Sequence, residues 1–263
     1  MNAWAELDAV LANRAAASAP VRLWWRDDDA TTDGPRLQRL LKLATAHRVP
    51  LALAVIPFAA SADLAAAVAV RPGVWVLQHG YSHQDRAAPG SKRQELVEQR
   101  STAELRAELL QGQRRLLELF GDRALAVLVP PWNRIDQSVA ALLPELGFRA
   151  VSTFRGAYAN LAVPGLCQSN CHLDPMDWEH RGFLGAEKSL RQLLGALQAG
   201  TNEPLGLMTH HGVHDAELWQ FLEQLLDSLA RHPGVCWLDA PTVFGLRLPI
   251  TAAGPDSSSA IPG

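Results

Sequence analysis

The chain has 263 residues, 48% of them hydrophobic and 19% charged, with a formal net charge of −3. This length suffices for one large domain or two small ones with a substantial hydrophobic core. The small negative charge and the lack of a basic tract argue against nucleic acid and anionic membrane surfaces as partners. No apolar run in the sequence is long enough to span a bilayer, so we expect no membrane span.

The predicted elements begin with a helix over residues 3–15, after which short apolar runs that predict β-strands recur along the chain. Segments with apolar residues at helical spacing lie between these runs. Repeated alternation of strand and helix predicts a parallel sheet flanked by helices. Seven such strands fit a distorted, incomplete (β/α)7 TIM-like barrel. The predicted strands are residues 21–25, 51–56, 74–77, 124–129, 148–152, 205–208 and 235–238.

Apolar stripes predict four further helices, and no linker divides the chain. We therefore expect a single barrel domain over residues 1–250, with the helix over residues 3–15 packed on it. Residues 251–263 are small and polar, which predicts a disordered tail. The N-terminal residues 1–8 are acidic and amphipathic, unlike the basic and then apolar start of a secretory signal, which predicts a cytoplasmic protein. The helical stripes lie in residues 37–44, 105–117, 190–197 and 218–229.

Three consecutive aspartates, Asp27, Asp28 and Asp29, follow the first predicted strand, which is largely apolar. Adjacent carboxylates repel each other, and burying one is costly unless a cation or hydrogen bonds compensate for it. A bound metal ion is the simplest feature that would stabilise such a cluster. The alternative is a solvated turn that precedes the next helix.

Other polar clusters also follow predicted strands. An α/β barrel builds its active site at the C-terminal ends of its strands, so these clusters are expected to meet. His79 and His83 are four residues apart, a spacing that on a helical turn places both imidazoles on one face to bind one ion. With one carboxylate they would leave a position for water or substrate, as catalytic zinc sites do. The other clusters are Pro130-Pro131-Trp132-Asn133-Arg134, Asp174-Pro175-Met176-Asp177-Trp178 and Thr209-His210-His211-Gly212.

The order and spacing of these clusters resemble the polysaccharide deacetylase family, carbohydrate esterase family four. That family has an acidic pair after its first strand, then H-[S/T]-x-x-H, R-x-P-Y/W, D-x-x-D-W and L-x-H segments. The matching segments here run from about residue 21 to residue 238. The resemblance implies the same incomplete barrel, a divalent metal ion and hydrolysis of an N-acetyl group.

Two alignments of the aspartate cluster with the family's acidic pair are open. The preferred one implies that Asp28 is the general base and that Asp29 binds the metal ion with His79 and His83, because it leaves Ala30 at a small-residue position. The other shifts the pair to Asp27 and Asp28.

The resemblance implies that a backbone N–H in the P-Y segment stabilises the oxyanion, and this position maps to Trp132, beside Pro131. The family arginine that precedes the segment and contacts the base is replaced here by Val129. Arg26 and Arg134 are the candidates to substitute for it.

His210 matches the terminal histidine of the family, which implies that it protonates the leaving amine, and the adjacent His211 is the alternative. The remaining residues that the resemblance implies are Asp174 or Asp177, which would tune this histidine, and Trp178 and Leu207, which would line the pocket.

The residues alone predict metal-assisted hydrolysis of a C–N or C–O bond. The resemblance implies a metal-dependent deacetylase that removes an N-acetyl group from an N-acetylated sugar or glycoconjugate by metal-activated water. Zn²⁺ is the expected cofactor, with Co²⁺, Mn²⁺, Ni²⁺ and Fe²⁺ as alternatives. One alternative function is an amidase that acts on a non-sugar small molecule. Another is a catalytically degenerate carbohydrate-binding member, which Val129 favours. A cytoplasmic location favours a soluble or lipid-linked sugar precursor over cell-wall polymer.

Overall fold

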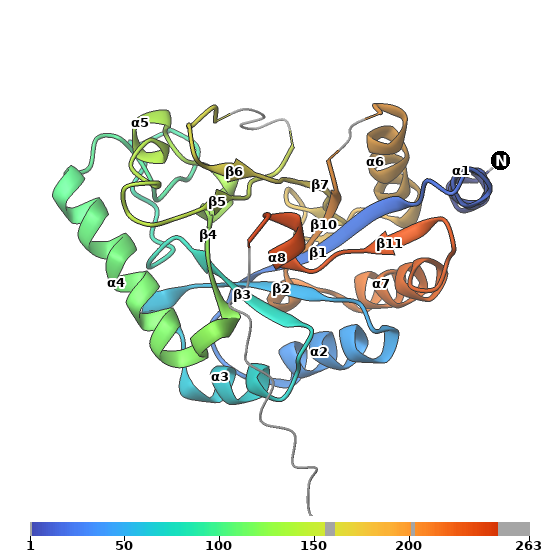
Figure 1. Cartoon of the computed structure of the whole chain (residues 1–263), viewed down its shortest axis with the longest axis horizontal. Coiled ribbons are helices and arrows are strands. Elements are labelled where there is room, and N and C mark those ends of the chain that lie inside the picture. The colour runs from blue at the N-terminus through green and yellow to red at the C-terminus, as the bar shows by residue number, and fades with distance from the viewer. Residues whose placement is uncertain (1, 156–160, 201–202, 247–263) are drawn as a thin grey trace, which may run out of the picture.

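The computed structural model describes residues 2–155, 161–200 and 203–246, and within these ranges nine parallel strands form one central sheet (Figure 1). The strand order is β6-β5-β4-β3-β2-β1-β10-β7, and β11 pairs with the first residues of β1. The strands are β1 (Val21–Ala30), β2 (Leu51–Val55), β3 (Val74–His79), β4 (Ala124–Val129), β5 (Ala150–Val151), β6 (Cys167–Gln168), β7 (Cys171–Leu173), β10 (Leu205–Thr209) and β11 (Val235–Trp237).

The sheet curls into an incomplete barrel, as predicted. Its two ends approach each other where Phe154, just after β5, forms one isolated parallel bridge with Cys171 of β7. A single bridge in place of a ladder leaves the barrel distorted at this point. A separate antiparallel hairpin, β8 (Met176–Asp177) and β9 (Gly182–Phe183), follows β7.

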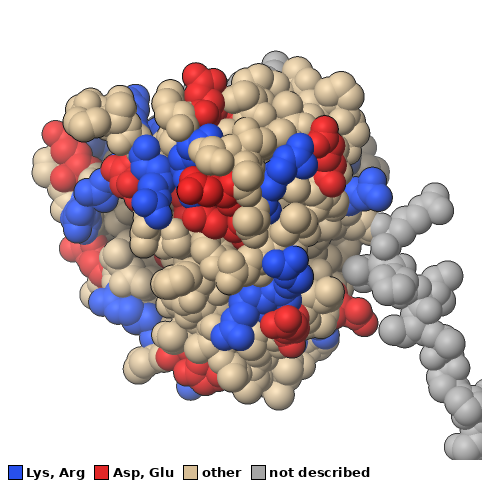
Figure 2. All heavy atoms as spheres, turned by 90° about the vertical axis from the view of Figure 1, so that its left-hand side faces the viewer, with Lys and Arg blue, Asp and Glu red and all other residues tan. Residues whose placement is uncertain are grey.

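Most of the helices lie along the outside of the sheet, and α1 packs against α6 (Figure 1). The short helix α8 instead packs on the inner side, in one cluster with Trp24. None of the helices in the described ranges is long and apolar enough to cross a membrane. Figure 2 shows basic and acidic side chains interspersed over one face, in keeping with the absence of a basic tract. The helices are α1 (Ala3–Ala16), α2 (Pro35–His47), α3 (Ala62–Ala69), α4 (Thr102–Phe120), α5 (Gln137–Ala140), α6 (Ala186–Gln198), α7 (Ala216–Leu229) and α8 (Ala240–Val243).

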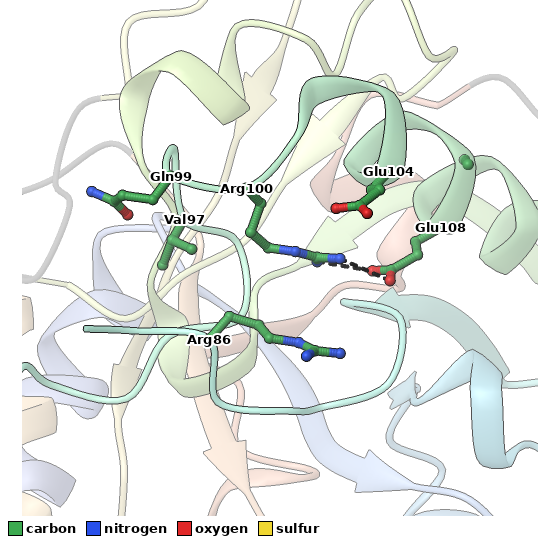
Figure 3. Close-up of a pocket in the computed structure, with 7 residues that line it drawn as sticks. Arg86, Val97, Gln99, Arg100, Glu104 and Glu108 are labelled. Atoms are coloured by element: carbon green, nitrogen blue, oxygen red, sulfur yellow. Dashed lines mark hydrogen bonds and ion pairs between the residues drawn. The ribbon is translucent and has the colours of Figure 1, made fainter. Parts of the chain in front are cut away.

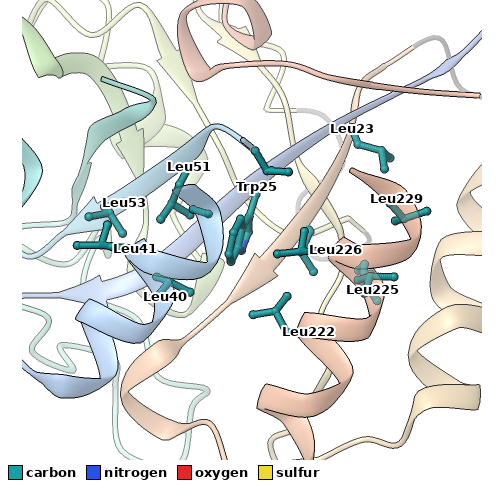
Figure 4. Close-up of a cluster of buried hydrophobic side chains, with 14 of the residues drawn as sticks. Leu23, Trp25, Leu40, Leu41, Leu51, Leu53, Leu222, Leu225, Leu226 and Leu229 are labelled. Carbon is teal, nitrogen blue, oxygen red and sulfur yellow. The ribbon is translucent and has the colours of Figure 1, made fainter. Parts of the chain in front are cut away.

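The alternation of side chains along β1 separates two hydrophobic cores. Trp24 belongs to a cluster with inward-facing residues of the other barrel strands, and Phe244 after α8 packs edge-on against it at 5.4 Å. Leu23 and Trp25 point the other way, into the layer between the sheet and the helices α2 and α7 (Figure 4). The same period places Arg26 and Asp28 on the inner side with Trp24.

All seven predicted strands and all five predicted helices are present. The prediction that the aspartate cluster follows the first strand was wrong, because β1 continues to Ala30 and contains Asp27, Asp28 and Asp29. The other bounds differ by a few residues. The sequence analysis missed the helices α3, α5 and α8. It also missed the strands β6 to β9, because strands of two or three residues are too short to give an apolar run. The predicted domain limit at residue 250 and the predicted tail over residues 251–263 lie outside the described residues.

Candidate active site

A pocket of about 780 Å³ opens at the C-terminal ends of β1, β3, β4 and β10. This location is where a barrel of parallel strands collects its functional side chains. The structure brings into it the predicted residues Asp28, Asp29, His79, His83, Trp132, Arg134, Asp174, Trp178 and His210. The pocket is also lined by Lys92, Arg93, Asn133, Phe154, Met176, Arg181, Met208 and Val213.

Asp29, His79 and His83 form a group that fits one metal ion. The Nε2 atoms of His79 and His83 lie 3.0 and 3.2 Å from Oδ1 of Asp29, and one ligand atom of each residue lies within 4.8 Å of the others. Two imidazole nitrogens and one carboxylate oxygen are a ligand set that suits a divalent ion such as zinc and leaves a coordination position open. The donor atoms present therefore fit the predicted metal.

A hydrogen bond to the backbone of the neighbouring strand fixes the orientation of His79. Its Nδ1 lies 2.9 Å from the backbone oxygen of Val129 on the neighbouring strand β4, so this nitrogen carries the proton and Nε2 faces Asp29. Burial lowers the pKa of His79, but the hydrogen bond to Asp29 and the charge of Asp28 outweigh this effect and raise it above the usual value. Burial likewise raises the pKa of Asp29, and the bonds to the two histidines hold it below its usual range.

The turn between the two histidines is not the helical turn that the spacing predicted. His79 is the last residue of β3, and Gly80 (φ 54°) and His83 (φ 57°) adopt left-handed backbone conformations. A Cβ on Gly80 would lie 2.0 Å from Oε2 of Glu95, so glycine is required there. The fully buried carboxylate of Glu95 accepts bonds from the backbone N–H groups of Tyr81 and Ser82 at 3.2 and 2.8 Å and fixes the turn.

Of the two arginines that the sequence offered as partners of Asp28, Arg26 is the one that contacts it. Its Nε and Nη2 donate to Oδ1 and Oδ2 of Asp28 at 2.8 and 3.0 Å, and the two side chains are 0% and 1% exposed. The guanidinium also donates to Ser152 at 2.6 Å and to Asn133 at 2.7 Å. Arg134 instead donates to the backbone oxygen of Arg93.

Asp27 and His211 point away from the pocket. Nδ1 of His211 bonds to Oδ1 of Asp27, while the other carboxylate oxygen accepts from the His211 backbone N–H at 2.9 Å and from Thr209 at 2.7 Å. Trp25 in turn donates to Thr209 at 2.9 Å. Burial raises the pKa of Asp27, but His211 lowers it more, so the carboxylate stays ionised. This buried network joins β1 to β10 beneath the helices.

His210 faces the pocket from the end of β10. Its Nε2 lies 3.9 Å from Oδ2 of Asp28, and its ring meets that of Trp178 edge-on at 4.6 Å. Trp178 Nε1 donates to Asp174 at 2.7 Å, and this hydrogen bond fixes the orientation of both side chains. Burial raises the pKa of Asp174, against the opposing charge of His210. The structure shows no direct hydrogen bond between Asp174 and His210 among the described residues.

Three residues expected at the substrate, Asp177, Leu207 and Pro131, do not line the pocket. Asp177 accepts from the backbone of Glu179 and His180 in the β8–β9 turn and does not line the pocket. Leu207 is buried on the outer side of β10, because side chains alternate along the strand and Met208 takes the inner position. Pro131 is buried and lies against Gly80.

Backbone conformations that non-glycine residues rarely adopt are concentrated around this pocket. Of the eight non-glycine residues with positive φ in the described ranges, five line it. Such strain typically accumulates at functional sites, where surrounding structure maintains it. Trp132 has φ 54° and ψ 18°, and its ring centroid lies 4.3 Å from that of His83, with the two rings tilted by 50°. The five residues are Asp29, His83, Trp132, Asn133 and Arg181.

A second hollow, of about 520 Å³, lies beside α4 (Figure 3). Arg100 and Glu108 form a bidentate ion pair there, with both N–O distances at 2.8 Å. None of the predicted site residues lines this hollow.

No protein-family model matches the sequence, and comparison with curated protein sequences gave no match. Solved structures do match. The Bc1960 peptidoglycan N-acetylglucosamine deacetylase is 15% identical with a TM-score of 0.61, over 87% of this chain and 90% of that chain. The PuuE allantoinase is 16% identical with a TM-score of 0.61, over 85% and 88%. A family 4 acetyl xylan esterase from Clostridium thermocellum, solved with a cobalt ion, is 15% identical with a TM-score of 0.53, over 86% and 91%.

Further neighbours are a family 4 carbohydrate esterase and a polysaccharide deacetylase. The chain therefore has the fold of these proteins, and the resemblance found in the sequence motifs is confirmed at the level of the fold.

Proposed function

We propose that this protein is a divalent-metal-dependent hydrolase that removes the N-acetyl group from an N-acetylated sugar or glycoconjugate. The observation that carries the proposal is the meeting of Asp29, His79 and His83 within one pocket, directly beside the Arg26–Asp28 pair. The fold shared with deacetylases supports it.

In this proposal Asp29, His79 and His83 hold the ion, for which zinc is the best match. With the ion bound, the site gains a Lewis acid that acidifies water and polarises a carbonyl. Asp28, fixed by Arg26, accepts the proton of the attacking water. His210, on the same side of the pocket, donates a proton to the departing amine nitrogen. The backbone N–H of Trp132 donates to the developing oxyanion.

A second candidate is hydrolysis of a non-sugar amide or cyclic ureide, and the structural similarity to an allantoinase supports it. The degenerate-binder alternative rested on Val129 in place of the family arginine. The Arg26–Asp28 pair weakens that argument, because the base carboxylate has an arginine partner from β1 instead.

The test is acetate release from a panel of N-acetylated hexosamines and their oligomers, with allantoin ring opening measured in parallel. The protein is assayed with added Zn²⁺, after chelation, and as Asp28→Asn. We expect zinc-dependent acetate release that Asp28→Asn reduces by on the order of 10² to 10⁴. Ring opening without acetate release would favour the second candidate. Turnover that persists fully in Asp28→Asn would contradict the proposed base.

A further inference from the structure

Four basic side chains line the pocket: Lys92, Arg93, Arg134 and Arg181. Lys92 and Arg93 lie in the loop after β3, and Arg134 follows β4, whereas Arg181 belongs to the β8–β9 hairpin that follows β7. In the sheet, β3 and β4 lie on one side of β1 and β7 lies on the other. The basic residues therefore flank the pocket from both sides.

None of these four cations forms a salt bridge with a carboxylate in the described part of the chain, where the arginine ion pairs involve other residues. Arg93 is the one of the four with an acid nearby, since its charge helps to lower the pKa of Asp85. Arg134 Nη1 donates to the backbone oxygen of Arg93 at 3.0 Å, which links the two rim segments and orients this guanidinium. Its remaining N–H groups are left for a ligand or water.

The carboxylates that line the same pocket already have partners. Asp28 is paired with Arg26, Asp29 contacts the two histidines, and Asp174 accepts from Trp178. An anion that enters the pocket would therefore meet cations without a salt-bridge partner at the rim, and carboxylates that already have partners inside.

The backbone of Arg181 strengthens this assignment. Its φ of 54° is a left-handed conformation in which a non-glycine residue is uncommon. The hairpin nevertheless places an arginine there and glycine at position 182. A strained residue at a pocket rim typically serves a ligand contact.

We propose that the substrate of this pocket is a phosphate-bearing N-acyl sugar and that Lys92, Arg93, Arg134 and Arg181 bind its phosphate. This inference rests on the proposed function, because it specifies the substrate class of the same site. A phosphate monoester carries about two negative charges and several acceptor oxygens, which matches several cations on two sides better than one carboxylate does.

Sugar phosphates, nucleoside diphosphate sugars and lipid-linked diphosphate sugars share this chemistry, so the experiment compares them. Acetate release is measured for N-acetylglucosamine, its 1-phosphate and 6-phosphate, its uridine diphosphate and short polyprenyl diphosphate derivatives, and N-acetylmuramate as the carboxylate case. We expect kcat/KM for one phosphorylated member to exceed that of the neutral sugar by on the order of 10²-fold, and salt to reduce the preference.

Arg181→Gln and Arg134→Gln should each reduce that preference by roughly tenfold. The matched control is Arg14→Gln, which removes an exposed arginine at the end of α1, outside the pocket lining. Equal kcat/KM for neutral and phosphorylated sugars would overturn the inference and leave the proposed function intact. A preference for N-acetylmuramate over every phosphorylated sugar would also overturn it.

A binding measurement can distinguish failure of this inference from failure of the proposed function. Calorimetric titration of Asp28→Asn with the 1-phosphate and 6-phosphate sugars reports affinity without turnover. Binding that an added Arg181→Gln substitution weakens by roughly tenfold supports the inference even if no panel member releases acetate, in which case only the proposed function fails. Absence of both binding and acetate release would overturn both.

Discussion

Arg26 and Asp28 stand two residues apart on β1 and form a bidentate ion pair inside the barrel, with N–O distances of 2.8 and 3.0 Å. Both side chains are fully buried, and Ser152 and Asn133 take up further N–H groups of the guanidinium. Because side chains on a strand alternate, residues i and i+2 share a face, and the inward face of β1 supplies both partners. The carboxylate is thus held next to Asp29 in one orientation.

Replacing Arg26 by lysine should lower kcat for acetate release by on the order of 10²-fold with little change in KM. Lysine keeps the charge but cannot form the two-pronged contact, and a carboxylate displaced by about 1 Å loses much of its catalytic advantage. Metal content should be unchanged. The measurement is steady-state kinetics with elemental analysis, and Arg14→Lys is the matched control.

Arg26 contacts Asp28 in place of an arginine at position 129, and a double substitution that moves the arginine back to position 129 tests this exchange. Arg26→Met/Val129→Arg should recover part of the activity that Arg26→Met loses, since Val129 also faces the barrel interior.

A well-folded Arg26→Lys enzyme with full kcat would show that the pair does not position the base.

His210→Ala should reduce hydrolysis of amide substrates far more than that of activated acetate esters. An amine must be protonated before it leaves, whereas a phenolate of low pKa leaves unassisted. Parallel kinetics on an N-acetyl sugar and 4-nitrophenyl acetate give the two losses. Equal losses on both substrates would assign His210 a positional role instead.

Asp27→Asn should lower the free energy of unfolding by about 3 kcal/mol or more, because it removes one partner of a buried ion pair. His211 is held at a raised pKa by Asp27 against the effect of burial, so its charge would be left uncompensated. Urea denaturation of Asp27→Asn and His211→Ala measures the effect. Loss of turnover without loss of stability in either variant would place the pair in the catalytic machinery after all.

Stability should fall as the pH drops below about 6.5, in part through His172. Burial lowers the pKa of His172 to about 4, and the neutral ring accepts a bond from the Gly206 N–H at 3.2 Å. Between these two pH values the unfolded chain takes up a proton that the folded chain does not. This difference lowers the free energy of unfolding by about 2 kcal/mol between pH 7 and pH 5.

His172→Asn, which keeps an acceptor for the Gly206 N–H, should show a shallower pH dependence of the urea midpoint. An unchanged slope would mean that His172 does not carry the effect.

The sequence was sufficient to predict the barrel because its strands are apolar runs that alternate with helical stripes, and several of them lead into a polar cluster. The sequence also indicated which residues meet, because the C-terminal ends of parallel strands share one edge of the sheet. Asp29 lies at this end of β1, and His79 lies at this end of β3. The expected helical turn between His79 and His83 was wrong. The spacing of two histidines does not reveal the left-handed residues or the distant Glu95 that shape the turn.

Other failures have equally local causes. The partner of Asp28 depended on whether Arg26 or Arg134 reaches the barrel interior, which follows from the sheet and not from either motif. Leu207 and Met208 are both apolar, so the motif alone did not fix which of them faces the pocket. The motif did not distinguish Asp177 from Asp174 as the residue near His210. The structure does, because the carboxylate of Asp177 accepts a backbone hydrogen bond within the β8–β9 turn.

We propose that Asp29, and not Asp28, binds a catalytic metal ion with His79 and His83. Elemental analysis of purified, dialysed protein tests it most directly, with wild type, Asp28→Asn and Asp29→Asn compared at equal concentration. The structure predicts about one divalent ion per chain in wild type and Asp28→Asn, and far less in Asp29→Asn. Metal retained by Asp29→Asn and lost from Asp28→Asn, or no bound metal in the wild-type protein, would contradict the claim.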